Sequence, residues 1–218
     1  MLMRTTGNRR VMASVGLSLL SGVACCVAGC LGPATPQGQT GFGYQAREPL
    51  PELYRVLMRT SKGDILLELD RTRSPITVDN FLRYVDDGFY TGTIFHRVVQ
   101  SGIFVIQGGG FLEDGSEKTT RNPIVLEDNN GRSNLRATLA MARTNAPDSG
   151  TSQFYINTQD NTNLDRAGNQ RGYAVFGVVL EGMDVVDAIA AEPLLDRGGA
   201  FSERPEVDVV IFSVERVN

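Results

Sequence analysis

Residues 95–111 place polar side chains that could do chemistry within two apolar stretches. The β-branched and aromatic residues of this segment predict two short strands, which His96, Arg97 and Gln107 interrupt. Polar residues that break the apolar pattern of a strand often mark a functional site. Histidine is a common general base, and the planar guanidinium of arginine can donate several hydrogen bonds in a fixed geometry. This segment is therefore the first candidate for a site.

Each of these residues also has an interpretation without catalysis. His96 has no nucleophile or acidic partner beside it in the sequence, which favours a structural, hydrogen-bonded histidine. Arg97 could be a strand residue held in a salt bridge. The three glycines at 108–110 precede no expected helix and lack the Lys-Ser/Thr pair of a phosphate-binding loop. A tight backbone turn is the favoured interpretation of these glycines.

The composition excludes several other kinds of chemistry. All three cysteines, Cys25, Cys26 and Cys30, lie near the N-terminus, and the chain has one histidine. We therefore expect no disulfide, thiol nucleophile, metal or cofactor in the folded domain. The net charge is −4, and without residues 1–29 the chain has 18 basic and 25 acidic side chains. This acidic balance argues against a nucleic-acid partner.

Short strands and two helices are expected to position the candidate segment. Ser74 is a good helix N-cap with Pro75 at the first helical position, and Gly88 is expected to end that helix. Apolar spacing predicts a second helix over residues 183–190. Strands are predicted at residues 54–58, 65–69, 93–99, 103–107, 124–125, 138–142, 152–157, 174–180 and 207–217. This many short strands favour a mainly β protein with a closed antiparallel barrel.

Several separate segments resemble the cyclophilins, a family of peptidyl-prolyl cis-trans isomerases. The segments that carry this resemblance are residues 75–81, 95–97, 107–109, 139–143, 151–156 and 173–178. The resemblance extends from Tyr54 to the C-terminus and is closest in character to the bacterial, periplasmic type. It implies an eight-stranded barrel capped by two helices and an enzyme that isomerises X–Pro bonds in polypeptides.

The resemblance also implies roles for individual residues. Arg97 matches the catalytic arginine of the family, and Gln107 matches the glutamine that positions the substrate backbone. Ala142 and Arg143 match residues whose main chain binds the peptide as an added strand. Phe104, Val105, Tyr155 and Leu164 match the proline pocket, Gln153 lies near the neighbouring side-chain pocket, and Tyr173 matches a tyrosine of the bacterial type.

The segment departs from the family pattern in one respect. Two residues more than usual separate Arg97 from Gln107, which affects the assignment of Phe104 and Val105 to the pocket. Without the resemblance, Phe104, Val105, Tyr155 and Leu164 would be interpreted as ordinary residues of the hydrophobic core. The insertion favours a rival hypothesis, in which the protein is a cyclophilin-like binding module or holdase with little turnover.

The N-terminal residues are expected to direct the protein out of the cytoplasm. Residues 1–10 contain three arginines, and residues 11–28 are almost wholly apolar or small, as in an export signal. A transmembrane anchor is the alternative. The residues before Cys30 resemble a bacterial lipobox, which implies that Cys30 is lipidated.

We therefore predict a lipoprotein signal peptide over 1–29, a flexible Gly-, Pro- and Gln-rich tether over 30–53, and an isomerase domain over 54–218. The predicted location is the cell envelope, facing the periplasm or the cell exterior. The expected partners are unfolded or newly exported proteins and, through the lipid, a membrane. The protein is expected to be a monomer.

Overall fold

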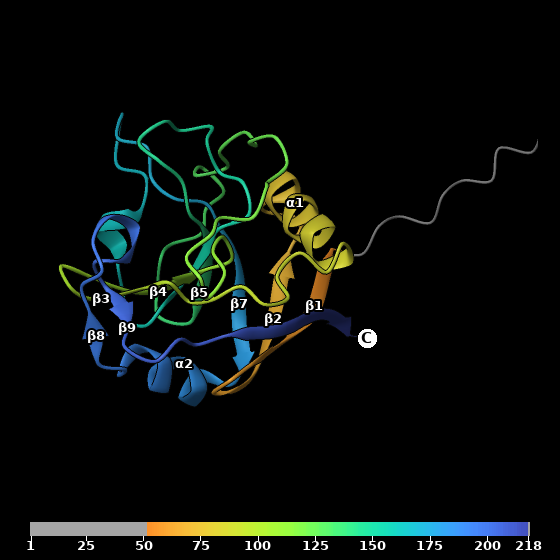
Figure 1. Ribbon diagram of the computed structural model, residues 1–218. Helices are drawn as coiled ribbons and strands as arrows, with labels where there is room; N and C mark the ends of the chain where they lie inside the picture. The colour runs from red at the N-terminus through yellow and green to blue at the C-terminus, as the bar shows by residue number, and fades with distance from the viewer. Residues whose placement is uncertain (1–51, 218) are drawn as a thin grey trace, which may run out of the picture. The chain divides into compact units, whose positions relative to one another are not determined.

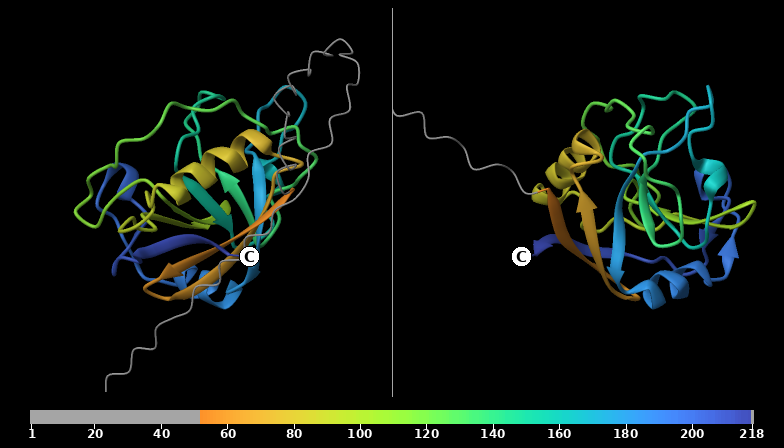
Figure 2. Two further views of the ribbon diagram at one scale, coloured as in Figure 1. Left: turned by 90° about the vertical axis from the view of Figure 1, so that its right-hand side faces the viewer. Right: turned by 180° about the vertical axis from the view of Figure 1, so that it is seen from behind.

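The computed structural model describes residues 52–217. The predicted signal peptide, most of the predicted tether and the lipidation residue Cys30 lie outside this range. Figures 1 and 2 show a strongly curved antiparallel sheet with one helix at each of its two ends. Within residues 52–217, neither helix is both long enough and apolar enough to cross a membrane.

Eight strands form the main sheet, in the order β10-β1-β2-β7-β5-β6-β4-β3. Their bounds are β1 Leu53–Thr60, β2 Gly63–Asp70, β3 Arg97–Ser101, β4 Ile103–Gly108, β5 Thr138–Met141, β6 Phe154–Asn157, β7 Val175–Glu181 and β10 Ile211–Val217. The first strand therefore begins one residue before the expected domain boundary. Two helices, α1 (Pro75–Asp86) and α2 (Met183–Ala190), cover the ends of the sheet.

The two outer strands of the sheet, β10 and β3, are joined by a short stretch of main chain rather than by a full strand pair. Ile211 accepts from the Gly92 amide at 2.8 Å and donates to the Thr93 carbonyl at 2.7 Å. The Phe95 amide donates to the Val209 carbonyl at 2.9 Å. The predicted strand over residues 93–99 is thus divided into two parts. Its first part bonds to the chain at and just before the outer strand β10, and regular strand pairing begins at Arg97 in β3.

Several smaller elements differ from the sequence-based expectation. The predicted strand at residues 124–125 is a single bridge between Ile124 and Gly150. A small hairpin that was not expected, β8 (Leu194–Leu195) paired with β9 (Arg204–Pro205), precedes β10. Two short 3-10 helices complete the described elements, η1 (Thr162–Leu164) and η2 (Gly199–Phe201).

Side chains alternate between the two faces of the sheet, and this separates two apolar clusters. The larger cluster is enclosed by the sheet and by α1 and α2, and it includes Val98 and Ile106. The smaller cluster lies on the outer face and contains Val99 and Val105 from the same two strands. A hairpin of alternating apolar residues therefore contributes to the core and to an outer surface at once.

The N-terminus of α1 is capped by a residue far away in the sequence. Ser74 stands at the N-cap as predicted, but its hydroxyl donates to the Val175 carbonyl at 3.0 Å and makes no capping bond. The carboxylate of Glu127 accepts instead from the amides of Ile76, at 3.1 Å, and Thr77, at 2.8 Å. A carboxylate at this position also complements the positive end of the helix dipole.

Replacing Glu127 with alanine should lower the free energy of unfolding by about 1–2 kcal/mol, because the first turn of α1 loses its acceptor. Chemical denaturation of the purified protein measures this change. Glu117→Ala, which removes an exposed carboxylate with no ion pair among the described residues, is the matched control. Equal stability of the two variants would contradict the capping role.

Candidate active site

A cavity of about 300 Å³ opens on the outer face of the sheet, over the smaller apolar cluster. Residues from the strands β3, β4 and β6, from the two 3-10 helices and from the connecting loops meet there. They are His96, Arg97, Ile103, Val105, Gln107, Phe111, Ala142, Arg143, Gln153, Tyr155, Leu164, Tyr173 and Ala200. The fold thus brings together every expected catalytic or substrate-binding residue of the described chain except Phe104.

Phe104 is placed wrongly by the sequence-based assignment, and strand alternation is the reason. Val105 and Gln107 point into the cavity from β4, so Phe104 belongs to the other face of that strand. Its amide and carbonyl bond the side chain of Asn161, each at 2.9 Å. Ile103, two residues before Val105, forms the cavity wall instead.

A row of polar side chains crosses one edge of the cavity. Arg97 and Gln107 are directly paired across β3 and β4, and the Arg97 Nη1 donates to Gln107 Oε1 at 3.4 Å. Gln107 Nε2 in turn donates to Gln153 Oε1 at 2.9 Å. Arg97 Nε donates to Glu203 at 2.8 Å, a partner that the sequence analysis did not identify. The guanidinium is therefore held on two sides while its side chain stays 36% exposed.

The floor of the cavity is apolar and largely buried. Val105 and Tyr155 are buried, and Leu164 packs against their cluster. The Tyr155 hydroxyl donates to Asn134 Oδ1 at 2.8 Å, and burial raises its pKa well above the ordinary value. Tyr155 therefore stays neutral at physiological pH, and its ring meets that of Tyr173 edge-on at 5.8 Å. Such a floor suits a small apolar ring better than a charged group.

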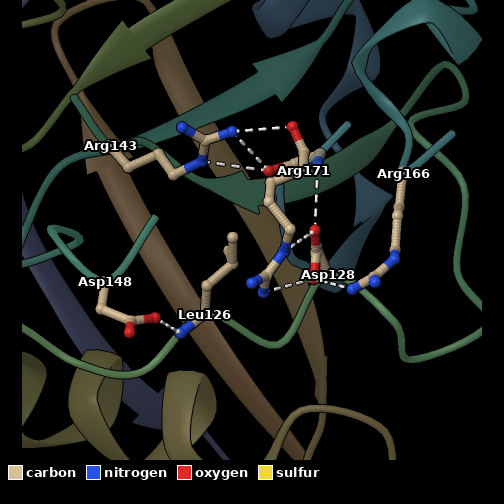
Figure 3. Close-up of polar contacts among 7 residues, drawn as sticks. Leu126, Asp128, Arg143, Asp148, Arg166 and Arg171 are labelled. Carbon is tan, nitrogen blue, oxygen red and sulfur yellow. Dashed lines mark hydrogen bonds and ion pairs between the residues drawn. The ribbon is translucent and has the colours of Figure 1, made fainter. Parts of the chain in front are cut away.

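Arg143 lines the cavity, and its side chain is held by neighbouring main-chain carbonyls. Its guanidinium lies 4.5 Å from the ring centre of Tyr173. It donates to the carbonyls of Thr144, Arg171 and Gly172 at 2.9–3.0 Å, and Figure 3 shows the last two contacts. Within residues 52–217 the amide of Arg143 has no hydrogen-bond partner.

A buried carboxylate, Asp128, joins the two long polar loops beside the cavity. Its side chain is 1% exposed and accepts two bonds from Arg171, each at 2.8 Å, and one from the Gly172 amide at 2.9 Å (Figure 3). Arg166 adds a longer contact at 3.4 Å. The hydrogen bond from Arg171 lowers the pKa of Asp128. Sequence reasoning did not single out Asp128, because nothing local distinguishes it from other loop aspartates.

His96 lines the cavity but is only 1% exposed. Its ring packs edge-on against Phe111, with 4.7 Å between ring centres. Burial lowers the pKa of His96 to about 4, so the imidazole is neutral at physiological pH. Its Nδ1 has no hydrogen-bond partner among the described residues. A packing role accounts for its position.

The structure is an eight-stranded antiparallel half-barrel sheet with two helices and a cavity on its outer face. The family model of cyclophilin type peptidyl-prolyl cis-trans isomerases matches residues 55–216. The chain therefore belongs to this family, and it is a peptidyl-prolyl cis-trans isomerase. Family members act on proline-containing polypeptides, as the sequence analysis expected.

Several bacterial isomerases are similar over most of their length. Peptidyl-prolyl cis-trans isomerase A of Dickeya dadantii is 47% identical over 73% of this chain and 83% of its own. The isomerase of Acinetobacter baylyi is 50% identical over 73% of this chain and 84% of its own. Peptidyl-prolyl cis-trans isomerase B of Escherichia coli is 48% identical over 73% of this chain and 97% of its own.

Solved structures share the fold at lower identity. A cyclophilin type isomerase from Cryptosporidium parvum has a TM-score of 0.62 and 24% identity, over 76% of this chain and 98% of that one. The cyclophilin AquaCyp293 from Hirschia baltica has a TM-score of 0.57 and 23% identity, over 74% of this chain and 73% of that one. The predicted mainly β fold with two helices is confirmed.

Proposed function

We propose that this isomerase is exported, is held at the cell envelope by a lipid on Cys30, and acts on unfolded or newly exported proteins. The arginines of residues 1–10, the apolar stretch over 11–28 and the small residues before Cys30 support export and lipidation. In this proposal residues 1–29 are removed, residues 30–53 form the tether, and residues 54–218 form a monomeric catalytic domain.

We further propose that Arg97 is the catalytic residue. Rotation of an X–Pro bond has a barrier of about 18–20 kcal/mol, because the nitrogen lone pair is delocalised into the carbonyl. In the twisted transition state that lone pair localises on nitrogen and can accept a hydrogen bond. A guanidinium N–H that donates to it stabilises this state more than either planar ground state. One such preorganised donor is worth about 3–4 kcal/mol.

The observation that carries this assignment is the position of Arg97 at the rim of an apolar floor. Arg97 lines the same cavity as Val105, Tyr155 and Leu164. A proline ring seated on these side chains would bring its nitrogen to the edge where the guanidinium lies. Ile103 takes the part of the pocket wall that the sequence analysis gave to Phe104.

The remaining cavity residues orient the peptide. The free amide of Arg143, beside Ala142, can pair with a substrate backbone in the manner of an added strand. Gln107 is oriented by Gln153, so its amide is preset to contact the substrate main chain. Tyr173 closes the side of the groove through its contact with Tyr155. No covalent intermediate is needed in this mechanism.

The experiment that tests the proposed mechanism is the relaxation of a short proline peptide from cis to trans in the presence of the purified protein. The full chain should accelerate this relaxation in proportion to its concentration. Binding of the peptide without acceleration would support the rival hypothesis of a binding module.

Replacing Cys30 with serine should abolish fatty-acid labelling and prevent normal signal cleavage, because the thiol is the nucleophile that is alkylated. Labelling of the variant expressed in a bacterial host, followed by fractionation of the cells, measures both effects. Cys25→Ser and Cys26→Ser are the matched controls and should be labelled normally. Unchanged labelling of the Cys30 variant would refute the lipid anchor.

A further inference from the structure

Glu203 reaches the proposed catalytic arginine from a distant part of the chain. Its carboxylate accepts from Arg97 Nε at 2.8 Å, and the two side chains are 32% and 36% exposed. Glu203 lies in the segment between β8 and β10, immediately before β9. The bond therefore connects the C-terminal part of the chain to the first residue of β3.

The main chain around Glu203 is firmly held, so its carboxylate has a defined position. The Glu203 carbonyl accepts from the Val98 amide at 2.8 Å. The next residue, Arg204, has a side chain that is only 4% exposed. It donates to the Glu113 carbonyl and to Asp208 Oδ1, each at 2.7 Å. These contacts attach the segment to both β3 and the loop after β4.

We propose that Glu203 is a positioning residue for Arg97. This inference rests on the proposed catalytic role of Arg97. Glu203 fixes the Nε side of the guanidinium, and Gln107 contacts Nη1. Within residues 52–217 no hydrogen bond uses Nη2, so the planar fork is oriented by protein on two nitrogens and presents the third to substrate. Holding the side chain in one rotamer before substrate binds removes an entropic cost from the transition state.

An ordinary surface ion pair is the simpler account of the same contact. Pairs as exposed as this one contribute little to stability, so removing Glu203 would then change neither folding nor turnover. The positioning role makes a different prediction. It places the effect in kcat, with little change in KM or in the unfolding temperature, because the floor of the pocket does not depend on Glu203.

The test measures proline isomerisation and peptide affinity for the purified full chain carrying Glu203→Ala or Glu203→Gln. Alanine should lower kcat about tenfold, the scale expected when part of the arginine's rotamer freedom is released. Glutamine keeps an acceptor at the same place and should retain most of the activity. Glu206→Ala removes an exposed carboxylate of the same segment and is the matched control.

A double variant separates positioning from structural damage. In an Arg97→Ala background, Glu203→Ala should cause no further loss, because a positioning residue has nothing left to position. A full kcat in Glu203→Ala, or an equal loss in both backgrounds, would overturn the inference. Near-normal activity of Arg97→Ala alone would instead overturn the catalytic assignment and this inference with it, so the two failures are distinguishable.

Discussion

Replacing Arg97 with alanine or with lysine is expected to lower kcat by about two orders of magnitude, the value of one preorganised hydrogen-bond donor of about 3 kcal/mol. Lysine keeps the positive charge but lacks the planar fork that Glu203 and Gln107 hold in place, so charge alone should not restore the rate. The relaxation rate of a short proline peptide, extrapolated to saturating substrate, measures this loss.

Peptide affinity should fall much less than kcat, because the apolar floor of the cavity remains intact in the Arg97 variants. Arg59→Ala is a suitable control: Arg59 pairs with Glu215 at 3.0 Å on strands β1 and β10 and does not line the cavity. The control should keep its full rate. If Arg97→Ala kept a near-normal rate, the mechanism would be wrong and the binding-module hypothesis would gain support.

Replacing Asp128 with alanine is expected to cost about 3 kcal/mol of stability, because a buried carboxylate with several donors is removed and those donors lose their partner. The loop that follows η1 should loosen, and Tyr173 with it, so peptide affinity should fall as well. Urea denaturation and amide hydrogen exchange over residues 165–173 measure the two effects.

A second aspartate of the protein provides the comparison. Asp86 makes the same two-bond contact with Arg216, at 2.7 and 2.6 Å, but its side chain is 50% exposed. Asp86→Ala should therefore cost less than about 1 kcal/mol. The difference between the variants isolates the effect of burial, and equal costs would refute the structural role assigned to Asp128.

Acid should remove the contribution that Asp128 makes to the stability of the folded protein. Its pKa in the folded protein is lowered, chiefly by the hydrogen bond from Arg171, below the value of about 3.9 for a free aspartate. The stabilisation is therefore complete above pH about 4 and is lost as the pH falls through the folded pKa. Asp128→Asn should show a shallower loss of stability in this window. An unchanged acid profile would show that other carboxylates dominate it.

Features that depend on neighbouring residues could be predicted from the sequence. The second helix was predicted at the bounds that α2 has, and Pro75 does begin α1, because apolar spacing and terminal residues act within a few residues. The polar residues Arg97 and Gln107 stood out for the same reason. In the structure these two residues are directly paired across β3 and β4.

Only the tertiary structure decided which partners those residues have. The side chain of Arg97 meets Glu203 across 106 positions of sequence, Thr77 is capped by Glu127 across 50, and Arg171 binds Asp128 across 43. No local pattern marks these acids, because their roles arise when distant loops are packed together. The presence of Ile103 rather than Phe104 in the cavity wall has the same origin. Neighbouring residues of a strand face opposite sides of the sheet, and the register of the folded sheet decides which of them faces the cavity.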